Sequence, residues 1–154
     1  MKGNTLLKAG TVGLLGSLVM FIPMKIGLKT GIAPFEIPPS AAFLKSLNLP
    51  AMPLALIGHF LYGAFWSIVF VALFKGSAGL GKGILLSIVL WLVMMLVISP
   101  IIGWGVFGAG ESPSDPALHL DPGPKYMVVT LVLHLLYGLL VGWLDPKWAA
   151  KEEE

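Results

Sequence analysis

The sequence predicts an all-α fold: a membrane-embedded four-helix bundle made of two parallel-related helical hairpins, a 2+2 repeat. Three observations predict it. First, 56% of the 154 residues are hydrophobic and only 12% are charged, whereas about 25% are charged in soluble domains. Second, four apolar runs are long enough to cross a bilayer as helices. Third, the motif His-x-x-Tyr-Gly occurs in two of these runs, at His59 and at His134.

The four runs define one expected transmembrane domain over residues 1–154. The clearest run, 54–74, has 21 uncharged residues. As a helix it is about 31 Å long, which matches the hydrocarbon core. The first run is uncharged only between Lys8 and Lys25, so we expect it to lengthen as both lysines snorkel; a cleaved signal peptide is its alternative. We expect spans at about 6–28, 54–74, 83–102 and 126–144, and outer loops at 29–53 and 103–125.

The first outer loop carries five prolines, and proline interrupts helices. It also carries large apolar side chains, which disordered segments lack. We therefore expect this loop to pack on the outer end of the bundle. A short interfacial helix over 41–47, capped by Ser40, is predicted within it.

Lysine placement predicts the orientation, because positive charge is enriched on the cytoplasmic side of a membrane. With the N-terminus in the cytoplasm, six lysines lie inside and four outside. We therefore expect a multi-pass protein of the inner (plasma) membrane with both termini cytoplasmic. The inner set is Lys2, Lys8, Lys75, Lys82, Lys147 and Lys151, and the outer set is Lys25, Lys29, Lys45 and Lys125.

The repeated motif places polar groups inside the membrane. Residues at i, i+3 and i+4 share one face of a helix. An unsatisfied polar group in hydrocarbon costs roughly 2–7 kcal/mol, so both motif faces should turn toward other helices. These faces consist of His59, Tyr62 and Gly63 in one span and His134, Tyr137 and Gly138 in the other.

The spans that precede the two motifs also echo each other, at 18–23 and 96–100. This pattern suggests a duplicated two-helix hairpin whose copies share one orientation. The two imidazoles would then lie in the same half of the bilayer and face each other. We expect each imidazole to be held by a tyrosine, by Thr130 or by a backbone carbonyl.

Composition excludes several functions. Cysteine is absent, so thiolate metal sites and cysteine nucleophiles are excluded. Arginine is also absent and the net charge is only +2, which argues against nucleic acid as a partner. The predicted spans contain no carboxylate that could act as a general base. We therefore expect no enzyme activity.

Three functions remain open. The first is a small accessory or structural subunit that packs against other membrane proteins, or against copies of itself, with membrane lipid around it. The second is a site for haem, a metal or a proton relay, in which His59 and His134 bind the cofactor and Tyr62 and Tyr137 assist. The third is a small transporter or channel that works as an oligomer.

The chain resembles the YagU-like family of small integral membrane proteins of unknown function. The resemblance implies a four-helix membrane protein and brings no established activity or catalytic residue. It rests on the Gly-rich first span, the Pro38-Pro39 loop, Gly58-His59 before the 66–70 segment, the third span ending in 99–103, and His134 in the last span.

Overall fold

The computed structural model describes residues 3–121 and 123–148 of the chain. Within these residues the fold is all-α and forms a four-helix bundle, as predicted. The third long helix is continuous through α4, a π-helical segment and α5. The helices are α1 (Gly3–Thr30), α2 (Pro39–Ser46), α3 (Leu54–Phe74), α4 (Leu80–Val93), the π-helical segment Met94–Ile98, α5 (Ser99–Ile102) and α6 (Lys125–Trp148), with 3-10 turns at Lys75–Ser77, Val106–Gly108 and Pro116–Leu118.

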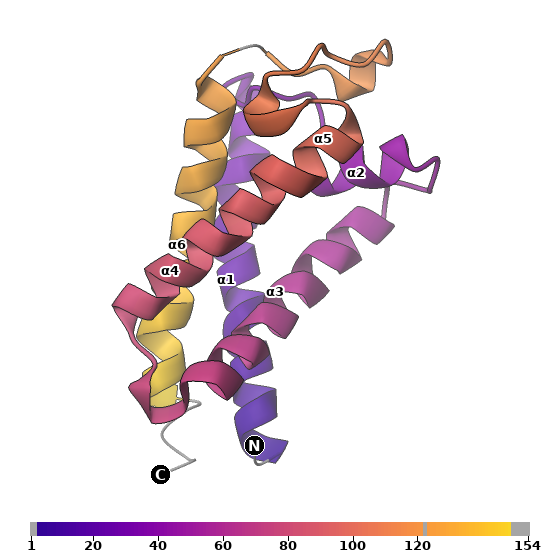
Figure 1. The fold of residues 1–154 in the computed structure, drawn as a ribbon. Coiled ribbons are helices and arrows are strands. Elements are labelled where there is room, and N and C mark those ends of the chain that lie inside the picture. Colours follow the sequence, from indigo (N-terminus) through magenta and orange to yellow (C-terminus); the bar gives the residue numbers. More distant parts are fainter. Residues whose placement is uncertain (1–2, 122, 149–154) are drawn as a thin grey trace.

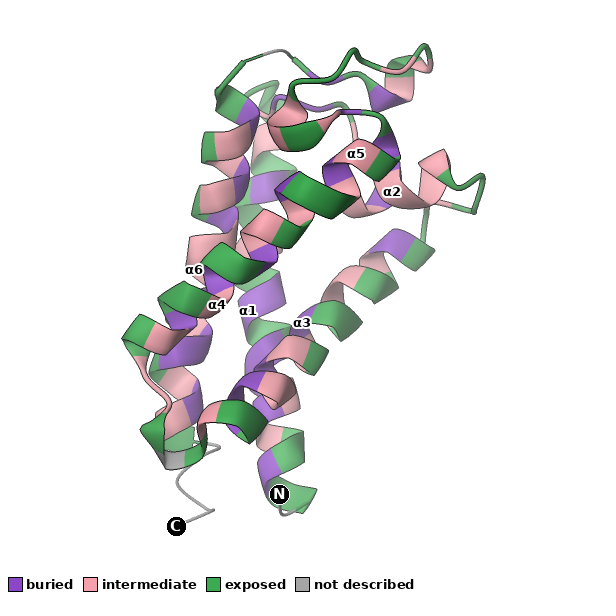
Figure 2. Cartoon of the chain, viewed as in Figure 1, coloured by how far each residue is buried: buried purple, intermediate pink, exposed green. Residues whose placement is uncertain are grey.

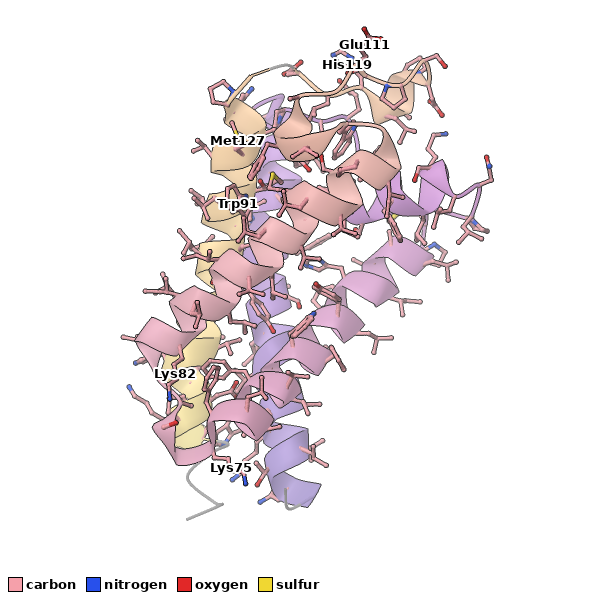
Figure 3. All side chains as sticks on the ribbon, viewed as in Figure 1. Lys75, Lys82, Trp91, Glu111, His119 and Met127 are labelled. Carbon is pink, nitrogen blue, oxygen red and sulfur yellow. The ribbon has the colours of Figure 1, made fainter. Side chains whose placement is uncertain are left out.

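The long helices form two pairs of helices that follow each other in the sequence, and the two pairs pack on each other. Helix α1 packs on α3, α4 packs on α6, and α1 also packs on α6. Helices α3 and α4 are joined by a short connection and both run obliquely across α1 and α6 (Figure 1), without packing closely on each other. The start of α1 and the end of α6 lie at the end of the bundle that carries Lys75 and Lys82, opposite Glu111 and His119 (Figures 1 and 3).

Four segments are long and apolar enough to cross a membrane: Gly3–Thr30, Leu54–Phe74, Leu80–Ile102 and Lys125–Trp148. Each keeps large apolar side chains exposed on the outside of the bundle, among them Leu14, Leu61, Leu85 and Val128 (Figure 2). A soluble protein rarely exposes continuous apolar surface of this extent. The chain is therefore a membrane protein, with lipid as the solvent of its outer face.

The last helix extends further than predicted. It was expected to end at residue 144, before Asp145-Pro146, but α6 continues to Trp148. Pro146 removes only one backbone hydrogen bond when it lies in a final turn, so the helix can tolerate it there. The extension brings Asp145 into the bundle, where it is fully buried. The charged run at 151–154, for which the sequence predicts a solvated tail, lies outside the described residues.

The outer loops form a packed cap. Phe35 stacks on Trp104 and meets Tyr126 edge to face, at ring-centroid distances of 6.2 and 6.4 Å. Trp104 Nε1 donates a hydrogen bond to the Leu118 carbonyl at 2.7 Å, which joins the two ends of the second loop. Phe35 also pairs with Leu120 through an isolated antiparallel bridge. The prediction that the first loop packs on the bundle is confirmed.

Helix α2 is the short helix expected in this loop, but Ser40 does not cap it. The helix begins at Pro39, and no side chain caps its first turn. Proline suits a first helical position because its missing N–H would have no partner there. At the other end of α2, Lys45 Nζ lies 2.9 Å from Asp115 Oδ2 of the second loop. This ion pair ties α2 to the cap.

The ion pair makes the mobility of α2 dependent on pH. The hydrogen bond from Lys45, followed by that from the Ala117 backbone N–H, lowers the pKa of Asp115 below its ordinary 3.8. A lowered carboxyl pKa means that the contact is present above pH 3.8 and is lost as the pH falls through the lowered value. A spin label at Leu47→Cys should therefore become more mobile as the pH falls below 3.8 and through the lowered pKa of Asp115.

The control for this prediction is a matched pair of carboxyl variants. Asp115→Asn should raise the mobility of the label at neutral pH and remove the acid step. Asp121→Asn, in the same loop, should leave the step in place. An unmodified protein whose label mobility is flat between pH 6 and the acid limit of folding, on the order of pH 3, would contradict the assignment.

Candidate functional site: the cavity between α3 and α4

Each hairpin is closed by a close approach of two glycines. A Cβ on Gly13 of α1 would overlap the carbonyl of Gly63 in α3, and a Cβ on Gly63 would overlap Ser17 Oγ. Ser17 Oγ in turn donates to the His59 carbonyl at 3.4 Å. Only glycine lets the two backbones approach so closely, so this contact, which we call the first seam, fixes how α3 lies on α1.

The second hairpin has the same contact. A Cβ on Gly83 of α4 would overlap the carbonyl of Gly138 in α6, and one on Gly138 would overlap Ser87 Oγ. Ser87 Oγ donates to the His134 carbonyl at 2.9 Å. In this second seam, α4 positions lie 70 residues after their α1 counterparts, since 83 − 13 = 70. The similar segments 18–23 and 96–100 are separated by a different number of residues, so they do not align the same positions as these contacts do.

Tyr137 joins the two hairpins. Its hydroxyl donates to the Gly63 carbonyl at 2.6 Å, and its side chain is only 4% exposed. The ring packs where α1 has Gly16, since a Cβ there would lie 2.7 Å from Tyr137 Cδ2. Tyr62, the same motif position in α3, is 47% exposed. The two motif tyrosines therefore have different roles.

Both motif histidines are held by backbone carbonyls, as predicted. His59 Nε2 lies 3.1 Å from the Ser17 carbonyl oxygen, and His134 Nδ1 lies 2.7 Å from that of Thr130. A carbonyl oxygen can only accept, so each of these ring nitrogens must carry the hydrogen and donate it. In the neutral ring the other nitrogen is then an acceptor. His59 Nδ1 and His134 Nε2 are these acceptors.

Between α3 and α4, which do not pack closely on each other, lies a cavity of about 420 Å³. His59, Tyr62, His134 and Tyr137, the four predicted site residues, all line it. Leu54, Tyr62 and Val93 line it and remain exposed, so the cavity opens sideways between α3 and α4. Helix α2, which lies near the start of α3 and beside α5 (Figure 1), contributes Pro39, Ser40, Phe43 and Leu44 to its wall. The apolar lining includes Met20, Met24, Phe43, Leu44, Leu90 and Met94.

Sequence reasoning found the histidines and tyrosines but missed the rest of the cavity wall. Phe43 and Leu44 of α2 belong to that wall, and only the apolar side of the predicted interfacial helix hinted at it. Met94 and Ile98 come from the π-helical segment. Such segments occur often at functional sites, and Pro100 shortly after it was the one available sequence signal.

A second polar cluster lies near the other end of the bundle and corrects the expectation that the spans contain no carboxylate. Ser67 Oγ lies 2.6 Å from the Ala9 carbonyl oxygen and 2.7 Å from Asp145 Oδ2. One hydroxyl hydrogen cannot serve two acceptors. Ser67 can donate to either oxygen, and both contacts are hydrogen bonds at once only when Asp145 is the carboxylic acid and donates to Ser67. Asp145 Oδ1 has no partner among the described residues.

Comparison with protein-family profiles, with curated proteins and with solved structures gives no match to this chain. The resemblance to the YagU-like family therefore stays a prediction. Among the described residues, no three His, Cys, Asp or Glu side chains come together in a way that could hold a metal ion. The functional argument rests on the geometry of the cavity.

The second seam predicts that alanine substitutions at two glycines of α4 change the free energy of unfolding by different amounts. Gly83→Ala places a methyl group against the α6 backbone and should destabilise the bundle by roughly 1–3 kcal/mol. Gly81→Ala meets open space and should leave stability unchanged or slightly raised. Thermal unfolding of both variants in the same detergent measures the difference. Equal midpoints would show that the second seam is not a close contact.

The Asp145 cluster predicts which substitutions the site tolerates. Asp145→Asn keeps a hydrogen-bond donor for Ser67 and should unfold near the unmodified protein. Asp145→Ala loses the donor and leaves Ser67 with a single partner, which should cost roughly 1–3 kcal/mol. Thermal unfolding again measures this cost, with the exposed Asp121→Asn as the control. If Asn costs as much as Ala, Asp145 does not act as a donor.

Proposed function

We propose that this protein is a small membrane binding protein that takes a molecule with an apolar body from the bilayer into the cavity between α3 and α4. The observation that carries the proposal is the cavity itself, which is largely apolar, opens sideways and has α2 as part of its wall. Binding sites for small molecules have volumes of about 300–1,000 Å³. The volume of about 420 Å³ lies within this range.

The size of the cavity decides between a small molecule and a helix from a partner. One turn of a helix 10 Å in diameter rises 5.4 Å and fills about 420 Å³. The cavity therefore has room for a single turn, whereas a transmembrane partner needs five or more. The expected accessory role, in which the motif serves packing against other proteins, gains no support from this space. That role and homo-oligomerisation stay predictions for the outer faces.

An empty cavity of this size is physically implausible. At about 24 cal/mol per Å³ an unfilled void of this volume costs about 10 kcal/mol, which is comparable to the whole stability of a domain. Open cavities in a bilayer can be filled by lipid chains or by a ligand of similar polarity. The exposed lining residues Leu54, Tyr62 and Val93 mark where such a molecule enters.

We further infer that the cavity arises from an unequal duplication of one hairpin. Aligned by their seams, 13–20 of α1 reads Gly-Leu-Leu-Gly-Ser-Leu-Val-Met and 83–90 of α4 reads Gly-Ile-Leu-Leu-Ser-Ile-Val-Leu. Gly16, which makes room for Tyr137, corresponds to Leu86. A leucine at this position leaves no matching space for Tyr62 beside α4. The α1–α6 contact therefore closes, while its counterpart between α3 and α4 stays open.

The other expected functions stay predictions. A haem bound by His59 and His134 would use the same two free nitrogens, and the absorption spectrum of the purified protein decides whether haem is present. A proton relay, transport by an oligomer and the cytoplasmic placement of both termini have no further support from the described residues. In the proposal the protein binds its ligand without chemical conversion.

The proposal predicts saturable photolabelling of the cavity. In lipid nanodiscs, a dodecyl chain with a terminal diazirine should label cavity residues such as Met94 in a saturable manner, and lipid-facing residues without saturation. Gly58 lies on the cavity face of α3, and a side chain there meets open space. Gly58→Leu should therefore fill the cavity and abolish the saturable part of the labelling.

Gly81→Leu is the matched control. Position 81 is also open but does not line the cavity, so this variant should keep the saturable labelling. Peptide mapping by mass spectrometry locates the labelled residues. Labelling that rises linearly with probe concentration at every site of the unmodified protein would overturn the proposed function.

A further inference from the structure

We infer that the molecule bound between α3 and α4 is neutral and carries a hydroxyl group, which donates a hydrogen bond to the free imidazole nitrogen of His59 or of His134. This inference rests on the proposed function and narrows the ligand to one chemical class, long-chain or polycyclic alcohols and phenols. It follows from which hydrogen-bonding atoms of the cavity wall are already used and which remain.

The hydroxyl hydrogens of three wall residues are used inside the bundle. Ser17 Oγ donates to the His59 carbonyl, and Tyr137 donates to the Gly63 carbonyl. Thr130 Oγ1 donates to the Tyr126 carbonyl at 2.7 Å and accepts from Trp91 Nε1 at 3.1 Å. These groups hold the helices together and have no hydrogen left for a ligand.

The two imidazoles are left with one acceptor each. His59 Nε2 and His134 Nδ1 donate to backbone carbonyls, so His59 Nδ1 and His134 Nε2 keep their lone pairs. Neither of these atoms is among the buried polar atoms without a partner, and both residues line the cavity. The free nitrogens are therefore open to the cavity. A ligand that satisfies them must bring a donor.

A hydroxyl group fits this set better than any group that only accepts. It can donate to an imidazole nitrogen while it accepts from Tyr62, whose hydroxyl also lines the cavity. A ketone, ester or ether oxygen could accept only from the hydroxyl groups of Tyr62 and Ser40, which also lines the cavity, and would leave both imidazoles without a donor. An unsatisfied buried acceptor costs roughly 1–3 kcal/mol. The wall therefore discriminates between a donor and an acceptor on the same apolar body.

The charge of the wall excludes ionic head groups from the cavity. None of the lining residues is Asp, Glu, Lys or Arg, and an ion without a partner is costly to bury. The nearest lysines, Lys25, Lys29 and Lys45, line a neighbouring hollow together with Glu36, and this hollow shares Met24, Ser40, Ala55 and His59 with the cavity. An anionic lipid would place its head group there, so the test includes anions.

The test is competition against the diazirine probe on the unmodified protein in nanodiscs. Four competitors share one chain: dodecanol, dodecyl methyl ether, dodecane and dodecanoate. Dodecanol should halve the saturable labelling at about one tenth of the concentration needed by the ether or by dodecane, the effect of about one net hydrogen bond. Concentrations are expressed per lipid, with partitioning measured in nanodiscs without protein.

The outcomes separate this inference from the proposed function. If all four competitors halve the saturable labelling at the same concentration per lipid, the hydroxyl inference is wrong and the proposed apolar site stands. If dodecanoate competes best, the head group is an anion and the inference is equally wrong. If the probe shows no saturable labelling, the proposed function itself fails.

Histidine variants then locate the acceptor. His59→Phe and His134→Phe should each reduce the advantage of dodecanol over dodecane, while dodecane still competes and so reports a folded cavity. His119→Phe, in the outer loop and away from the cavity, should keep the full advantage. If both cavity variants keep it, the imidazoles do not accept the hydroxyl. The ligand series needs no variant, so the conclusion holds even if one variant fails to fold.

Discussion

The close approach of two helix backbones at facing glycines is the contact on which the rest of the structure depends. In lipid there is little hydrophobic drive to bring apolar helices together, so packing and interhelical hydrogen bonds must do so. The two seams supply both, because each glycine pair is accompanied by a serine that donates to a carbonyl of the opposite helix. Each carbonyl belongs to a motif histidine. The position of each imidazole is therefore set by the seam one turn away.

The cavity exists because the two similar seams have different residues around them. Tyr137 can reach the Gly63 carbonyl because Gly16 leaves space for its ring. This contact ties α6 to both helices of the first hairpin. Among the described residues, Tyr62 makes no equivalent contact with α4, and its side chain stays half exposed. One closed and one open interface between similar hairpins leave a cavity whose wall keeps the polar residues of both motifs.

Much of this structure could be predicted from the sequence. The four spans follow from length and hydropathy, and the inward direction of the motif histidines follows from the cost of unsatisfied polar groups in hydrocarbon. Even their carbonyl partners could be expected, since backbone carbonyls are the commonest acceptors inside a helical bundle. The packed outer cap was also predictable, because Phe35 has too much apolar surface to remain in water.

The cavity could not be predicted, because it depends on the angle between helices that are far apart in sequence. That angle follows from single residues such as Gly16 and Leu86. The residues that they face on other helices become known only when the structure shows how the helices pack at the seams. Asp145 was missed for a related reason. An Asp next to Pro146 is typical of the end of a helix, so the sequence places it in solvent. Only the packing of α6 on α1 and α3 shows that Asp145 contacts Ser67 inside the bundle.

The lateral opening determines what can give this site its selectivity. A molecule that enters from the bilayer has already left water, and lipid chains are as apolar as the leucines and methionines of the wall. Moving its apolar body into the cavity therefore gains shape complementarity but little hydrophobic free energy. What distinguishes one bilayer component from another is then the polar end, which meets only His59, His134 and a few hydroxyl groups. In the proposed function, the seams that hold these imidazoles therefore also set the selectivity of the site for its ligand.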